Sequence, residues 1–175
     1  MAHALHKSNN IGGIQWKRSN YSKHSTEKWR RCSKKFDSAE EDSEKRKIVF
    51  DIADNLAGHA TIEERYFYPN VRERATEEDV KEAYDEHLEI KELILQGLNG
   101  TERPGFDGIV AALKGTVEHH VEEEENEFFP KVKKLIDEDA LEAIGQAMET
   151  EFEEIMAEGA PRDNVRVESE KPAAI

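Results

Sequence analysis

Apolar residues recur every three or four positions along most of this chain, and this spacing most constrains its fold. Within residues 39–68, for example, Ile48, Ile52 and Leu56 follow one another at steps of four. Similar series occupy residues 77–98, 105–136 and 138–157. Residues spaced in this way share one face of an α-helix. We therefore predict four long helices, each with one apolar face.

The composition agrees with narrow apolar faces. Charged residues make up 37% of the chain and apolar residues another 37%, so charge is higher and apolar content lower than in an average globular protein. The 10 glycines and 5 prolines are too few for a turn-rich β domain. We predict an all-α protein whose limited apolar surface is concentrated on helix faces.

Charge is divided unevenly along the chain. Residues 1–37 contain nine Lys or Arg against two acids, whereas the whole chain has a net charge of −14. The basic segment is either an arm for nucleic acid or another anionic surface, or a disordered tail that partly neutralises an acidic body. We favour the tail, and we expect no nucleic-acid partner because a phosphate backbone requires a basic face.

One motif occurs twice, 61 residues apart, and it carries the candidate chemistry. Residues 59–69 and 120–130 both read H-x3-E-E-x4-P. Residues four apart are neighbours on a helix, so His59 lies beside Glu63 and His120 beside Glu124. Both pairs continue the apolar face of their helix, and a buried carboxylate is costly unless it is paired or binds metal.

A third imidazole, that of His87, lies on the apolar face of residues 77–98. Taken singly, His87 is typical of a hydrogen-bonded core histidine, and each glutamate of a salt-bridged acid. Taken together, three histidines and two glutamates on core faces favour a site for iron, manganese or zinc. The predicted ligands are His59, Glu63, His87, His120 and Glu124. Glu64 and Glu125 lie one residue further round and either face solvent or support the ligands, and His119 points away from the site.

Three stretches of this sequence, HATIEERYFYP, EHLEIKELI and HHVEEEENEFFP, resemble the hemerythrin-like, HHE cation-binding family. The resemblance covers about residues 40–136. It implies an up-down-up-down four-helix bundle that holds two iron ions with an oxo or hydroxo bridge. By the same resemblance His59 and His120 are terminal ligands, Glu63 and Glu124 are bridges, and His87 is a ligand from the third helix. Another divalent metal could take the place of iron.

Two positions depart from the family pattern. Lys91 stands where several members have a second histidine on the third helix. The expected first helix, which should carry another histidine, is replaced by the basic stretch from Lys28 to Phe36, in which we see no apolar stripe. Back-translation in a shifted frame yields V-E-E-M-F here, which fits the family better. We therefore hypothesise that residues before about Phe36 are partly a frameshifted reading; the alternative is a chance match, and the coding DNA can decide between them.

The predicted organisation has four parts. Residues 1–37 form the basic, atypical first segment, and residues 38–136 form the hemerythrin-like bundle. Residues 137–158 add a C-terminal helix, and residues 159–175 form a flexible tail. The single cysteine, Cys32, permits no disulfide framework, and we find no signal-peptide core and no membrane-spanning run. We expect a cytoplasmic protein without a membrane partner.

Three functions remain open. The first is a non-haem di-iron protein that binds or senses dioxygen, nitric oxide or iron, with an apolar lining from Ile62, Phe67, Leu113 and Val117. The second is a di-iron enzyme that handles peroxide or nitric oxide. The third is a metal-free acidic bundle that binds a protein partner of unknown identity. No nucleophile triad or phosphate-binding loop is present, so we favour a binding protein over an enzyme.

Overall fold

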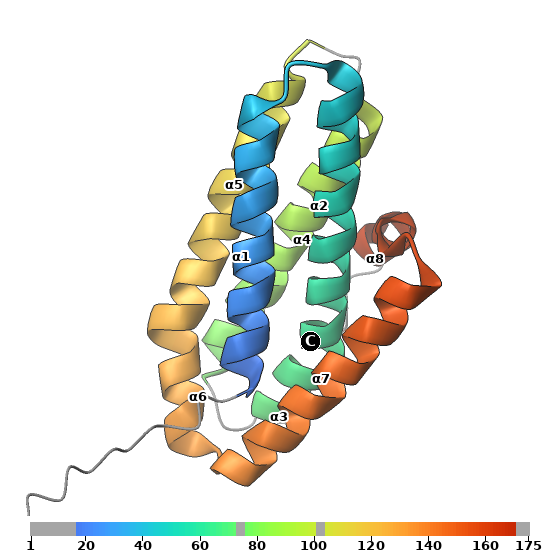
Figure 1. The fold of residues 1–175 in the computed structure, drawn as a ribbon. Coiled ribbons are helices and arrows are strands. Elements are labelled where there is room, and N and C mark those ends of the chain that lie inside the picture. Colours follow the sequence, from blue (N-terminus) through green and yellow to red (C-terminus); the bar gives the residue numbers. More distant parts are fainter. Residues whose placement is uncertain (1–16, 73–75, 101–103, 171–175) are drawn as a thin grey trace, which may run out of the picture.

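The helices of the bundle, four in number within the described residues, lie side by side and alternate in direction (Figure 1). The structure is a computed structural model, and it describes residues 17–72, 76–100 and 104–170. The four are α1 (Lys17–Ser38), α2 (Asp42–Ile62), α4 (Glu77–Gly100) and α5 (Phe106–Glu123). The all-α, up-down-up-down four-helix bundle expected from the sequence is therefore confirmed.

Two of these helices pass through a wider turn that lies within the repeated motif. α2 leads into a π-helical turn, η1 (Glu63–Phe67), and then α3 (Tyr68–Val71). In the same way α5 leads into η2 (Glu124–Phe128) and α6 (Phe129–Leu135). A proline inside a helix normally ends or kinks it, and here Pro69 and Pro130 lie in the first turn of α3 and α6. The wider turn instead accommodates a residue that has no N–H, and each helix continues beyond its proline.

α1 contradicts two expectations for the basic first segment: that it is a disordered tail outside the bundle, and that it has no apolar stripe. Trp29, Cys32 and Phe36, at steps of three and four, are all buried in the core of the bundle. The lysines and arginines between them masked this stripe in the sequence. The side chains of residues 17–27 lie outside the described part of the chain. The frameshift hypothesis concerns the coding DNA and stays a prediction.

The predicted extra C-terminal helix is α7 (Glu138–Glu158), which runs obliquely across α1 and α2 (Figure 1). It begins after Asp137, whose side chain accepts a hydrogen bond of 2.9 Å from the backbone N–H of Ala140. Close approach to α2 depends on Gly58, because a Cβ there would lie 2.9 Å from the ring of Phe152. Position 58 therefore allows α7 to cover the bundle.

The end of the described chain is folded, whereas we had predicted a flexible tail over residues 159–175. A short 3₁₀ turn, η3 (Pro161–Asn164), leads into α8 (Val165–Glu170). Val165 is fully buried, and the Arg162 guanidinium pairs with Asp54 of α2. The prediction is thus wrong for residues 159–170, because long-range contacts order a segment that has no periodicity of its own. Residues 171–175 lie outside the described part.

Two apolar cores fill the bundle, one on each side of a polar layer. The upper core includes Ile52, Leu56 and Val110, and the lower core includes Phe67, Phe128 and Met148. Along α2, α4 and α5 the change from one core to the other occurs at a histidine. The predicted metal ligands therefore lie at the boundary between the two cores. Within the described residues, no helix is both long and apolar enough to cross a membrane.

Candidate metal centre

Four of the predicted ligands form a tight group in the polar layer. His59 and Glu63 come from α2 and η1, and His120 and Glu124 come from α5 and η2; all four are buried. One ligand atom from each residue lies within 4.8 Å of the corresponding atoms of the other three. Within each pair, the Nε2–Oε2 distance is 3.0 Å for His59 and Glu63 and 3.8 Å for His120 and Glu124.

His87 joins this group from α4. Its ring is buried, and its Nε2 lies 3.2 Å from His120 Nε2 and 3.5 Å from Glu63 Oε2. The structure thus brings together the five side chains that the sequence singled out. Three imidazoles and two carboxylates at these distances form a donor set that could hold a metal ion.

The far nitrogen of two of these histidines is held by a carboxylate outside the group. Glu86 Oε2 lies 2.8 Å from His120 Nδ1, and Glu64 Oε1 lies 3.0 Å from His87 Nδ1. Such partners orient a ligating histidine and direct its other nitrogen toward the metal. Glu64 therefore supports the candidate site, whereas the equivalent Glu125 in the second motif is exposed.

These contacts shift the pKa values of the groups involved. Burial alone would lower the pKa of His87, but hydrogen bonds and charges from Glu63 and Glu64 outweigh burial and raise it to about 9. Burial alone would raise the pKa of Glu64, yet His87 and Lys91 bring it below its usual value. Burial would likewise raise the pKa of Glu86, but His120, Glu123 and His119 bring it below its usual value.

Tyr68 also reaches the centre of the group, and our sequence analysis missed it. Its hydroxyl lies 3.2 Å from His87 Nε2, 3.3 Å from Glu124 Oε1 and 3.5 Å from Glu63 Oε2. On a regular α-helix a residue five positions after Glu63 would point about 140° away. The extra residue in the π turn η1 brings Tyr68 onto the same face. The sequence signal that could have identified Tyr68 is the proline that follows the aromatic pair Phe67-Tyr68.

Lys91 occupies the position at which the family resemblance led us to expect a histidine. It lies one turn after His87 on α4 and is buried, with only 3% of its surface exposed. Its ammonium lies 2.8 and 2.9 Å from the two carboxylate oxygens of Glu64 and 3.2 Å from Glu168 of α8. Lys91 is therefore paired beside the candidate site rather than pointing into it.

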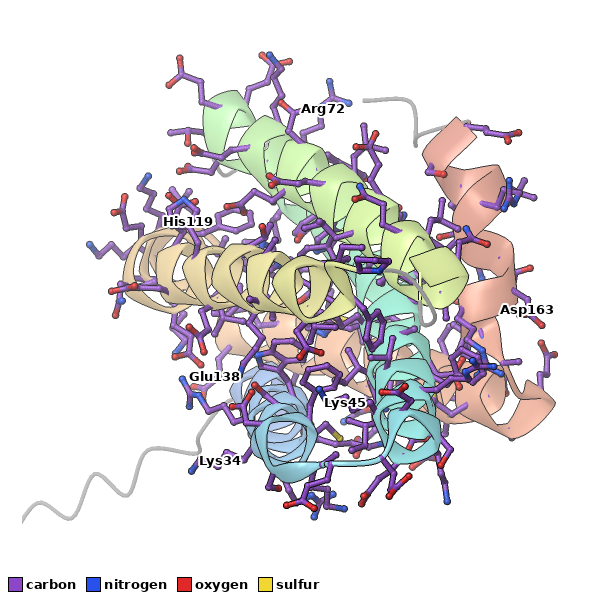
Figure 2. The ribbon with its side chains drawn as sticks, turned by 90° about the horizontal axis from the view of Figure 1, so that it is seen from above. Lys34, Lys45, Arg72, His119, Glu138 and Asp163 are labelled. Carbon is purple, nitrogen blue, oxygen red and sulfur yellow. The ribbon has the colours of Figure 1, made fainter. Side chains whose placement is uncertain are left out.

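His119 lies outside the group, as we expected. Figure 2 shows it on the outer side of the bundle, and its side chain is largely exposed. It forms a second cluster with Glu86 and Glu123, in which His119 Nε2 lies 3.3 Å from Glu123. Because Glu86 already accepts the His120 Nδ1 hydrogen bond, this cluster belongs to the surroundings of the central site.

A small cavity of about 20 Å³ borders the three histidines. That volume holds about one water-sized molecule. Its remaining lining is mostly apolar and comes from Trp29, Leu56, Ala60, Ile90, Val117 and Val121. Of the four lining residues that we predicted, Val117 borders the cavity; Ile62, Phe67 and Leu113 are buried in the two cores.

A model of the Hemerythrin HHE cation binding domain matches residues 26–132 of this chain. The match includes residues 26–38 of α1 and all five predicted ligands, and it spans more than half of the sequence. The chain therefore belongs to the hemerythrin HHE cation-binding domain family. Searches of curated proteins and of solved structures found no match.

Proposed function

We propose that this protein binds two iron ions in the polar layer and uses them to bind or sense dioxygen or nitric oxide. The observation that carries the proposal is the burial of three imidazoles and two carboxylates at mutual contact distances between two apolar cores. Without a cation, so many buried ionisable groups are costly. A cation supplies the positive charge that two buried carboxylates need.

The donor set suits iron. Carboxylates placed between two facing motifs can bridge a metal pair, and imidazoles can complete each coordination sphere. We assign Glu63 and Glu124 as bridges and His59, His87 and His120 as terminal ligands. The hydroxyl of Tyr68 is placed either to bind metal as a further oxygen ligand or to hold Glu124 by a hydrogen bond. A reduced iron pair supplies the electrons that hold dioxygen or nitric oxide.

The cavity supports a small ligand rather than an organic substrate. Its volume of about 20 Å³ leaves room for about one water-sized molecule, and dioxygen and nitric oxide are of similar size. Trp29, Val117 and Val121 line this cavity and also a cleft of about 360 Å³ at the surface, so they separate the two. The buried Nε1 of Trp29 has no hydrogen-bond partner among the described residues, and a ligand in the cavity could provide one.

The first test is iron analysis of the purified chain after reconstitution with ferrous iron, together with its absorption spectrum. We expect about two irons per chain and near-ultraviolet bands from oxygen-to-iron charge transfer. A folded chain that retains no iron would overturn the proposal and favour the metal-free bundle. Turnover with peroxide or nitric oxide, measured on the same sample, would instead favour the enzyme alternative.

The second test concerns entry of the ligand. We expect Trp29→Leu to increase the rate at which nitric oxide binds the ferrous protein, because a smaller side chain opens the cavity to the cleft. Arg30→Leu is the matched control, since Arg30 lines the cleft but not the cavity. Equal rates in wild type and both variants would show that ligands enter elsewhere.

A further inference from the structure

A buried ion-pair cluster connects the C-terminal helix α8 with the candidate metal site. Lys91 is its centre, and its ammonium contacts Glu64 from η1 and Glu168 from α8. A lysine buried to this degree is costly unless its charge is compensated. Two carboxylates compensate it here, one from each side. Lys91, which stands where the family resemblance implies a histidine, is therefore paired with Glu64 and Glu168.

Glu64 is shared between Lys91 and a predicted metal ligand. Its Oε1 lies 2.8 Å from Lys91 Nζ and 3.0 Å from His87 Nδ1, and its Oε2 lies 2.9 Å from Lys91 Nζ. The lysine thus contacts both oxygens and holds the carboxylate in one orientation. In that orientation Oε1 accepts a hydrogen bond from His87 Nδ1, and His87 Nε2 is directed toward Glu63 and His120.

The second partner of Lys91 depends on the fold of the chain end. Glu168 reaches Lys91 because Val165 is buried against the bundle and Arg162 pairs with Asp54. Glu168 is itself partly buried, with 26% of its side chain exposed. The segment 161–170 therefore supplies a charge to the cluster around the metal site although it is distant from the motif in sequence.

We propose that Lys91 is a positioning residue for the metal centre. It acts through Glu64, which it holds against His87 Nδ1 so that His87 Nε2 faces the metal, and Glu168 extends this arrangement to the C-terminal segment. The proposal rests on the proposed metal-binding function and goes beyond it by assigning roles to three residues outside the ligand set. If Lys91 had only a structural role, replacing it would change the stability of the fold but would leave the Nδ1 hydrogen bond of His87 unchanged.

The test uses zinc as a diamagnetic probe with the full chain. Zinc affinity is measured by competition with a chromophoric chelator, and the His87 Nδ1–H is followed by ¹⁵N NMR in zinc-loaded protein. We expect Lys91→Met to weaken zinc binding about tenfold to a hundredfold, the usual cost of losing an outer hydrogen-bond partner. We also expect the Nδ1–H signal to lose its protection from solvent exchange.

A double-mutant cycle tests whether Lys91 acts through Glu64. We expect the combination of Lys91→Met and Glu64→Gln to weaken zinc binding no more than Glu64→Gln alone. Lys114→Met is the matched control, because Lys114 forms an ion pair with Asp37 away from the site and should leave zinc affinity unchanged. Glu168→Gln should weaken zinc binding less than Lys91→Met does, because Lys91 still contacts both carboxylate oxygens of Glu64.

The outcomes separate the two proposals. Wild-type protein that binds no zinc would overturn both. Wild-type binding with an unchanged affinity and an unchanged His87 signal in Lys91→Met would overturn the positioning role alone, as would additive effects in the cycle. If Lys91→Met fails to fold, Glu64→Gln and Glu168→Gln decide the question: an unaltered His87 signal in both variants would contradict the proposal.

Discussion

The two copies of the H-x3-E-E-x4-P motif place matching residues in different surroundings. Glu64 of the first copy is largely buried and contacts His87 and Lys91, whereas the equivalent Glu125 is exposed. Tyr68 of the first copy directs its hydroxyl at the candidate ligands, and the equivalent Phe129 has none. The two copies therefore place equivalent side chains among the candidate ligands only at the His-Glu pair.

This difference follows from what packs against each copy. The first copy faces α4, which contributes His87 and Lys91, and α8 adds Glu168 nearby. At the second copy, the residue that meets its histidine is Glu86, also from α4. A duplicated sequence therefore produces a symmetric pair of ligands and an asymmetric set of supporting contacts. Four predictions test at which positions the two copies act alike and at which they differ.

The largest effect is expected where the copies are alike. Glu63→Ala and Glu124→Ala should each reduce the bound metal, because both carboxylates belong to the candidate ligand group. If wild type is measured at a metal concentration about 1,000 times its Kd, it gains about 4 kcal/mol of stability that a non-binding variant lacks. Metal analysis and thermal unfolding measure both quantities. Glu125→Ala is the matched control, and a loss of metal there equal to that in Glu124→Ala would contradict the assignment.

The copies should differ at the next glutamate. Glu64→Gln should weaken metal binding about tenfold to a hundredfold because His87 loses its charged partner. Glu125→Gln should have no measurable effect, since its side chain faces solvent. Chelator competition on both variants makes the comparison, and equal affinities would show that burial of Glu64 has no bearing on the metal.

Metal binding should also depend on pH through His87. Because its pKa is raised from 6.5 to about 9, a proton competes with the metal throughout this interval. Apparent zinc affinity should therefore increase about tenfold per pH unit between these values. In chelator-treated protein, the charged His87 stabilises the fold fully below pH 6.5, and this contribution is lost as pH rises through about 9. An affinity that does not change with pH would contradict the prediction; His119→Asn should leave the dependence intact.

The smallest effect on metal content is expected at the aromatic position. Tyr68→Phe should keep the metal, because the five principal ligands remain, while the loss of the hydroxyl costs about 1 kcal/mol. Phe129→Tyr should destabilise the fold by about 1–3 kcal/mol, because it adds a hydroxyl next to the rings of Phe67 and Phe128. Iron content and thermal unfolding distinguish the two variants. A metal-free Tyr68→Phe protein would make Tyr68 an essential ligand.

Much of the fold could be read from the spacing of residues. The predicted ranges 77–98 and 138–157 correspond closely to α4 and α7, because helical periodicity is a local property. The same spacing placed His59 beside Glu63 and His120 beside Glu124. The spacing did not predict α1, because basic residues hid the apolar stripe that begins at Trp29. It also did not predict the fold of residues 159–170, which are ordered by contacts with the distant Asp54 and Lys91.

The sequence by itself determined helices α2, α4, α5 and α7, the face on which each candidate ligand lies and the pairing within each motif. Tertiary structure alone decided that Glu64 meets Lys91, that Glu86 meets His120, and that the π turn brings Tyr68 into the site. The physical reason is the range of the interactions. Spacing along a helix specifies neighbours one turn apart, whereas contacts between helices depend on how their faces pack together in three dimensions.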